Sequence, residues 1–263
     1  MESTIILKNE TSIAKIGSDY WPLINQAIIA VKEILNNHIV EIRLLGSVPS
    51  GNAIIGNSDI DFLAITNKSV DDNCKSRIEE TAREFSKKSP VVSSIDIDVM
   101  SQEEIGRHPA YELIIRTDSV SLYGSDKYTV KEYQISNTEL AHLWNIDFDS
   151  IIISYRRKLI SSEISELEIK KYSKFTGKDI MKCFRRRLIL DYGICDRRID
   201  MLYESLKRYL PEHSVLFDAL WGLYRYPNDN IDAILRVMDE AENSKKQIMT
   251  ELNNLSENTE TSR

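Results

Sequence analysis

The chain has 263 residues, of which 42% are hydrophobic and 29% are charged, and its net charge is −7. This composition is typical of a globular protein that can bury a sizeable core in one or two domains. It excludes a membrane-spanning protein, because no apolar run approaches the roughly twenty residues that a span needs. Net acidity also argues against a dedicated binder of long duplexes. The acidic, weakly apolar start is unlike a signal peptide, so we expect a cytoplasmic protein.

The positions of the cysteines and histidines argue against several kinds of metal and catalytic site. No cysteines stand at CxxC spacing and the histidines do not cluster; these residues are Cys74, Cys183, Cys195, His38, His108, His142 and His213. We therefore expect reduced thiols and no structural zinc, His-based metal site or serine-type triad.

The first half of the chain alternates between strand and helix patterns. Apolar spacing predicts helices at Ser18–Asn36, Ser69–Lys88 and Ala110–Thr117. Short, mostly apolar runs predict strands at Ile39–Leu45, Ile60–Ile65, Val91–Met100 and Ser119–Tyr123. This alternation predicts an α/β (α+β) domain with a mixed sheet.

The second half has helical spacing throughout. Helices are predicted at Thr138–Ser162, Glu163–Tyr172, Lys178–Tyr192, Asp196–Leu210, Glu212–Leu223 and Ile231–Leu255. We expect an α/β domain over 1–130, a boundary within 125–137, an all-α helical-bundle domain over 137–255, and a disordered tail over 256–263.

A glycine–serine turn and two aspartates form the most informative pattern. The first strand runs into Gly46-Ser47, and Asp59 and Asp61 begin the second. Carboxylates at i and i+2 on a strand point to one face and repel each other, so they need a cation. Oxygen ligands suit Mg²⁺. The pattern therefore favours metal-assisted phosphoryl or nucleotidyl chemistry, and the alternative is a turn with two exposed aspartates.

This pattern resembles a known signature. Leu45-Gly46-Ser47, eleven intervening residues and Asp59-Ile60-Asp61-Phe62 are similar to the motif of the polymerase β-type nucleotidyltransferase superfamily. The resemblance implies two Mg²⁺ ions held by the aspartates, an NTP substrate, expected to be ATP, and release of pyrophosphate. The α/β half followed by a helical half resembles stand-alone aminoglycoside nucleotidyltransferases.

The superfamily places a third acid on a neighbouring strand, and this chain offers two. Asp96 and Asp98 would share one face of the strand Val91–Met100. The following Ser101–Ile105 resembles the segment after the third carboxylate in small-molecule members, which favours Asp96 as catalytic residue and metal ligand and leaves Asp98 as the substitute. The alternative is an edge strand with solvated acids.

Positive charge is concentrated in the helical half. Residues 155–208 carry 15 Lys and Arg against 8 Asp and Glu. Lys178, Lys182 and Arg186 stand at i, i+4 and i+8 and would form one stripe. By resemblance, Lys182 and Arg186 would bind the nucleotide phosphates together with Gly46 and Ser47.

Three functions fit these observations. The first transfers a nucleoside monophosphate to a hydroxyl of a small molecule such as an aminoglycoside, which would confer antibiotic resistance. The second acts on tRNA or protein, as nucleotidyltransferase toxins do. The third is a non-catalytic, antitoxin-like module, against which the complete motif argues. Glu163, Glu166 and Glu168 are weak candidates for a base in the helical domain.

Overall fold

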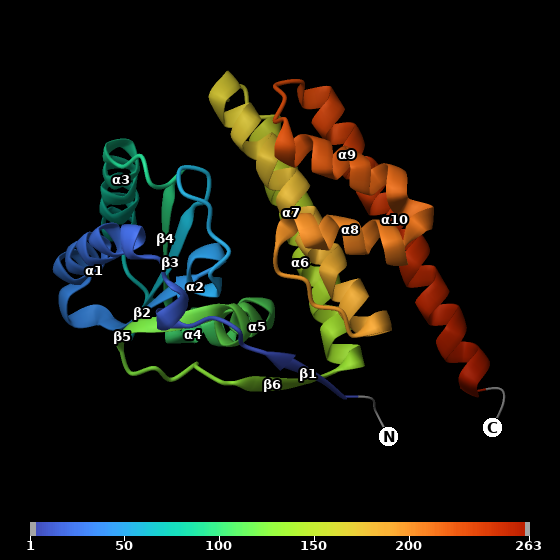
Figure 1. The fold of residues 1–263 in the computed structure, drawn as a ribbon, viewed down its shortest axis with the longest axis horizontal. Helices are drawn as coiled ribbons and strands as arrows, with labels where there is room; N and C mark the ends of the chain where they lie inside the picture. The colour runs from blue at the N-terminus through green and yellow to red at the C-terminus, as the bar shows by residue number, and fades with distance from the viewer. Residues whose placement is uncertain (1–3, 261–263) are drawn as a thin grey trace. The chain divides into compact units, whose positions relative to one another are not determined.

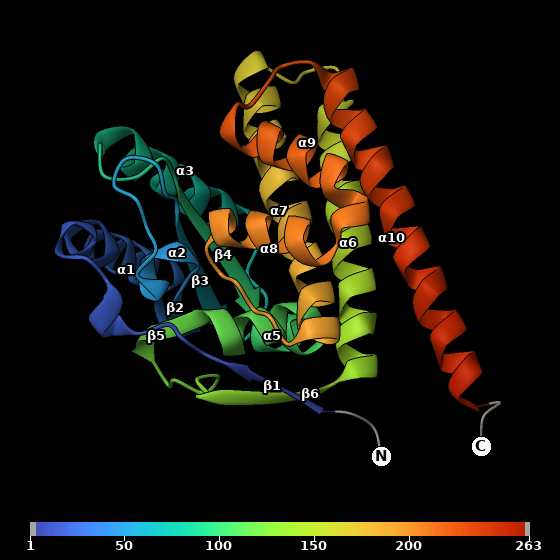
Figure 2. The same cartoon turned by 45° about the vertical axis from the view of Figure 1, so that its right-hand side comes forward.

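The computed structural model describes residues 4–260, and the chain divides into two compact units, Met1–Ser136 and Asn137–Arg263 (Figure 1, Figure 2). The main elements of the first unit are β1 (Thr4–Lys8), α1 (Trp21–Leu35), β2 (Ile39–Leu45), α2 (Ser47–Ser50), β3 (Ile60–Thr66), α3 (Asp72–Lys88), β4 (Ile95–Ser101), α4 (Gln102–Gly106), α5 (Pro109–Asp118), β5 (Ser119–Gly124) and β6 (Glu132–Ser136). Those of the second are α6 (Asn137–Leu159), α7 (Glu166–Tyr192), α8 (Ile199–Tyr209), α9 (Ser214–Arg225) and α10 (Ile231–Glu260). None of the helices described has the length and apolar character that crossing a membrane requires.

The first unit is built on a four-stranded sheet with the order β4-β3-β2-β5. β2 is antiparallel to both β3 and β5, whereas β3 and β4 are parallel. The predicted mixed sheet is therefore confirmed. β4 is an edge strand, so its side chains have a strand neighbour on one side only.

Alternating side chains of the sheet supply two separate cores. Ile60, Phe62 and Ala64 of β3 pack in the cluster that contains the buried residues of α1 and α3, and Figure 1 shows these two helices together on one side of the sheet. Leu63 and Ile65 belong to a second cluster with residues of α4 and α5. Because side chains alternate along a strand, Asp61 lies on the face of Leu63 and Ile65.

A small second sheet ties the start of the first unit to its end. β1 pairs antiparallel with β6, from Thr4 opposite Ser136 to Lys8 opposite Glu132. Neither strand was predicted from the sequence, and β6 lies within the expected domain boundary at residues 125–137.

The third predicted strand begins later than expected. β4 starts at Ile95, not at Val91. The backbones of Val91 and Ser93 bond instead to the loop that precedes β3, through the pairs Gly56 N with Val91 O at 2.7 Å and Ser93 N with Ser58 O at 3.0 Å. The shift leaves Asp96 and Asp98 on the strand.

The helical unit has one continuous α7 where two helices were predicted. Gly177 lies in its middle, and a Cβ there would be 2.3 Å from the carbonyl oxygen of Leu220 in α9. Glycine at this position therefore permits close helix packing and does not end the helix, which explains the wrong prediction. α7 packs in one core with α6, α8, α9 and α10, centred on Trp144, Phe184 and Phe217.

The last helix extends into the segment that was expected to be a disordered tail. α10 runs through Glu260. Residues 261–263 of that segment lie outside the described residues.

Candidate active site

The Gly46-Ser47 turn follows the end of β2 directly. Gly46 has φ 79° and ψ −140°, a backbone conformation that is essentially restricted to glycine. A Cβ on Gly46 would lie 2.9 Å from Oδ2 of Asp61. The turn therefore lies against the second aspartate of the motif, as close as a residue without a side chain allows.

Ser47 has a hydroxyl that lacks a partner. Its Oγ is buried and makes no hydrogen bond. A buried hydroxyl without a hydrogen-bond partner costs free energy, so a ligand that accepts a hydrogen bond from it would be stabilised. A phosphate oxygen would satisfy it.

Sheet register brings two of the predicted acids together. Asp61 of β3 pairs in register with Leu45 of β2 on one side and with Asp96 of β4 on the other. Paired residues on adjacent strands are about 4.8 Å apart in the backbone, and their side chains share a face. Ser94 donates a hydrogen bond from its Oγ to Oδ2 of Asp96, at 3.2 Å. Asp59 lies one residue before β3 and, like Asp61 and Asp96, is half-buried.

These acids alone do not form a complete metal-binding site. Among the side chains that the structure describes, no group of three or more Asp, Glu, His or Cys is close enough together to hold a metal ion. Mg²⁺ commonly takes only one or two carboxylates and completes its shell with water and substrate phosphates. The carboxylates of Asp61 and Asp96, with the Gly46-Ser47 turn close to Asp61, therefore fit an ion that arrives with a nucleotide.

Asp98 occupies a different place from Asp96. It pairs in register with Leu63, and its Oδ2 accepts a hydrogen bond from Oη of Tyr111, at 2.7 Å. Desolvation by surrounding protein atoms raises the pKa of Asp98; the hydrogen bond from Tyr111 opposes this shift, and the charge of Asp96 adds to it. Desolvation and the Asp98 carboxylate also raise the pKa of Tyr111, so the phenol stays protonated.

The predicted basic stripe of α7 is divided between surface and interior. Lys182 is exposed, and its Nζ is 3.5 Å from Oδ1 of Asp179. Arg186 is buried and forms an ion pair with Asp147. Lys178 is half-buried and lies over the ring of Phe175. Nucleotide binding by Lys182 and Arg186 stays a prediction.

Sequence reasoning missed a buried ion pair on β2. Glu41 and Arg43 are fully buried and pair with each other, and Nε of Arg43 donates to Oγ of Ser119 at 2.8 Å. The signal was present, because opposite charges at i and i+2 on a strand share a face. The hydrogen bond from Arg43 to Ser119 therefore links β5 to β2, the strand that leads into Gly46.

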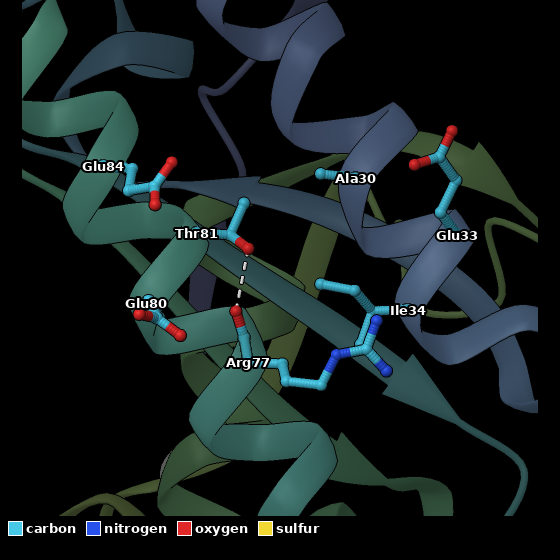
Figure 3. Close-up of a pocket in the computed structure, with 7 residues that line it drawn as sticks. All are labelled: Ala30, Glu33, Ile34, Arg77, Glu80, Thr81 and Glu84. Carbon is cyan, nitrogen blue, oxygen red and sulfur yellow. Dashed lines mark hydrogen bonds between the residues drawn. The ribbon is translucent and has the colours of Figure 1, made fainter.

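One surface pocket lies away from these residues. It has a volume of about 280 Å³ and is formed by α1 and α3, with Ala30, Glu33, Ile34, Arg77, Glu80, Thr81 and Glu84 around it (Figure 3). None of the predicted site residues lines it. It is therefore separate from the motif.

Comparison with known protein families now identifies the domain. Residues 24–123 match the family model described as "Nucleotidyltransferase domain". This range contains Gly46, Ser47, Asp59, Asp61 and Asp96. The chain carries a nucleotidyltransferase domain. The nucleotidyltransferase activity predicted from the motif is thereby confirmed.

A solved structure shares the fold of this nucleotidyltransferase. It is the crystal structure of spectinomycin adenyltransferase AAD(9) from Enterococcus faecialis with ATP and spectinomycin, which is similar at 16% sequence identity with a TM-score of 0.54. The match covers 84% of this chain and 99% of that one. It confirms the fold class of a mixed α/β region followed by a helical region. A comparison with curated protein sequences finds no significant match.

Proposed function

We propose that this nucleotidyltransferase moves a nucleoside monophosphate from an NTP, in the first instance ATP, to a hydroxyl of a small molecule and releases pyrophosphate. The observation that carries the proposal is the juxtaposition of Asp61 with Asp96 and with Gly46. The unpartnered hydroxyl of Ser47 beside them adds a place for a phosphate.

Each residue of the site has a distinct task in this reaction. Asp59, Asp61 and Asp96 would hold Mg²⁺, which when bound supplies charge compensation for the triphosphate and acidifies the acceptor hydroxyl. Ser47 would donate a hydrogen bond from its hydroxyl to a β- or γ-phosphate oxygen. The acceptor oxygen forms a bond to the α-phosphorus while the bond from that phosphorus to pyrophosphate breaks, and Asp96 receives the proton of the hydroxyl.

Lys182 and Arg186 are proposed as further phosphate-binding cations. Lys182 is more available to a ligand than Arg186, because its ammonium is exposed and lies 3.5 Å from Oδ1 of Asp179. Arg186 already has Asp147 as its partner. If Arg186 also contacts the nucleotide, it does so in addition to its structural ion pair.

We further propose a cationic acceptor of the aminoglycoside type. Outside residues 155–208 the chain carries 19 Lys and Arg against 33 Asp and Glu. Such a surface attracts polycations and repels nucleic acid. The structurally similar AAD(9), crystallised with spectinomycin, also supports this class of acceptor. The reaction would take place in the cytoplasm, where ATP is available.

A tRNA acceptor is the second candidate, and the excess of positive charge over residues 155–208 favours it. The two candidates are separated by a screen with α-phosphate-labelled NTPs and Mg²⁺, in which spectinomycin, streptomycin, kanamycin, bulk tRNA and protein are offered in parallel. We expect label on an aminoglycoside. Label on tRNA at low salt, with every aminoglycoside unmodified, would overturn the small-molecule proposal.

A further inference from the structure

Asp98 is a carboxylate that the proposed transfer reaction does not use. It lies on β4 two residues after Asp96, on the same face of the sheet; the residue as a whole is exposed to solvent, while protein atoms crowd its carboxylate. Its register partner is Leu63 and the next residue on that face is Met100, both of which belong to an apolar cluster. Asp98 is therefore a carboxylate that lies next to apolar side chains and two residues from Asp96.

The contacts of Asp98 leave its charge uncompensated. A single hydrogen bond reaches it, from Oη of Tyr111 to Oδ2. In the described part of the chain, no Lys, Arg or His forms an ion pair with it. Tyr111 also packs against the apolar cluster of Leu63, so the phenol holds the carboxylate in a defined orientation. One carboxylate oxygen is held by Tyr111, and the other remains available to a ligand.

Neither of the simpler roles accounts for this arrangement. As a third metal ligand, Asp98 would need to lie beside Asp61, but the register places Asp96 there. As a charge that only protects the sheet edge, it would be solvated on all sides. A hydrogen bond from a phenol that is itself packed against a core is not needed for that purpose.

We propose that Asp98, oriented by Tyr111, is the residue that recognises a cationic amino group on the acceptor. The proposal rests on the proposed function and adds the group that selects the substrate. Residues two apart on a strand are separated by roughly 6.6 Å. A hydroxyl that reacts next to Asp96 therefore leaves an ammonium roughly this far away to meet Asp98.

Tyr111 acts as a positioning residue in this scheme. Its hydroxyl donates to one oxygen of Asp98 and so directs the other oxygen toward the acceptor. Removing the hydroxyl leaves the negative charge in place but frees its orientation. The effect of Tyr111→Phe should therefore go in the same direction as that of Asp98→Asn and be smaller.

The test compares Asp98→Asn, Tyr111→Phe and the control Glu103→Gln. Asparagine keeps the shape of the side chain and can still accept from Tyr111. Glu103 is an exposed acid of α4 that forms an ion pair with Arg107, so replacing it with glutamine changes the net charge equally and leaves the proposed site intact. KM and kcat are measured with the better-labelled of spectinomycin and kanamycin, whose positive charges are all amines, and again with its fully N-acetylated, uncharged form.

The expected result is a split between KM and kcat. Asp98→Asn should raise KM for the cationic acceptor about 10- to 100-fold, as for a lost charge-assisted contact, and leave kcat within about threefold. The N-acetylated form should have a high KM that Asp98→Asn does not change. Glu103→Gln should behave like the unchanged protein.

Three outcomes would overturn the proposal. They are an unchanged KM in a folded Asp98→Asn protein, equal use of the charged and acetylated acceptors, and no labelling of any aminoglycoside. Mg²⁺-dependent binding of ATP to the same samples is measured separately by calorimetry. If ATP binds while aminoglycosides stay unlabelled, the acceptor assignment fails alone; if ATP does not bind, the proposed function fails with it.

Discussion

Replacing Gly46 with alanine tests the closeness of the turn to Asp61. Gly46 combines φ 79° with ψ −140°, a conformation that costs a residue with a Cβ on the order of 1–3 kcal/mol. The added Cβ would also lie 2.9 Å from Oδ2 of Asp61, whereas ordinary contacts begin at 3.4 Å. The two effects act on different properties of the protein, stability and activity.

The expected magnitudes follow from these two contacts. Backbone strain should lower the free energy of unfolding by about 1–3 kcal/mol. The clash itself should cost little stability, since the end of a side chain can move aside by about 0.5 Å. That displacement, however, moves a proposed catalytic carboxylate, and misplacement on this scale can cost about a hundredfold in rate.

Gly56→Ala is the matched control. Gly56 has φ 74°, so alanine is strained there as well, but its Cβ would meet only the Pro90 carbonyl oxygen, at 3.4 Å. Urea unfolding and turnover of labelled ATP are measured for both variants. We expect similar losses of stability and a much larger loss of activity for Gly46→Ala. Equal activity in the two variants would refute the inference that the turn positions Asp61.

Further predictions concern the helical unit. Lys182→Ala should weaken ATP binding by about 1.5–3 kcal/mol without changing stability; unchanged affinity in calorimetry would remove it from the nucleotide site. Arg186→Ala should lower the free energy of unfolding by about 2–3 kcal/mol because its partner loses its cation, and unchanged ATP affinity in the folded fraction would make its role purely structural. Gly177→Ala should destabilise the protein by about 1–3 kcal/mol, because the new Cβ would be 2.3 Å from the backbone of α9, which cannot easily move. Gly222→Ala, whose Cβ would have nothing within 4 Å, should instead stabilise α9 by up to about 1 kcal/mol. Equal melting temperatures of the two variants would contradict this. Burial raises the pKa of the Cys183 thiol from 9.0 to about 12. Above about pH 9 the unfolded chain therefore loses a proton that the native chain keeps, and the free energy of unfolding falls as pH rises. Cys183→Ala should make this fall less steep by up to about 1.4 kcal/mol per pH unit, and an identical slope would show that the thiol does not contribute.

The catalytic half could be predicted well because its signals are local. β2 and β3 are apolar runs bounded by turn residues, and the Gly46-Ser47 and Asp59-Ile60-Asp61 pattern sits at their ends. Period-two alternation already places Asp96 and Asp98 on one face. Which of the two lies beside Asp61 depends on strand register, which no local pattern specifies.

The remaining features depend on contacts between distant parts of the chain. β1 pairs with β6 across more than a hundred residues. Both strands have only five residues, and although β6 alternates between polar and apolar side chains, so short a run is weak evidence for a strand without its partner. Gly177 resembles a helix break until α9 is seen against it. The hydrogen bond from Tyr111 of α5 to Asp98 of β4 could not be predicted, because it depends on how the helix packs near the strand.

The most direct test of the account is the transfer of label from α-phosphate-labelled ATP to the aminoglycoside panel, by the unchanged protein and by Asp61→Asn. Label transfer and pyrophosphate release should depend on Mg²⁺ and stop when the Mg²⁺ is chelated. Asp61→Asn, shown to be folded by its unfolding curve, should lose at least about a hundredfold in transfer rate. A folded Asp61→Asn protein with near-normal transfer, or transfer that survives chelation, would contradict the central claim that these aspartates carry out metal-assisted nucleotidyl transfer.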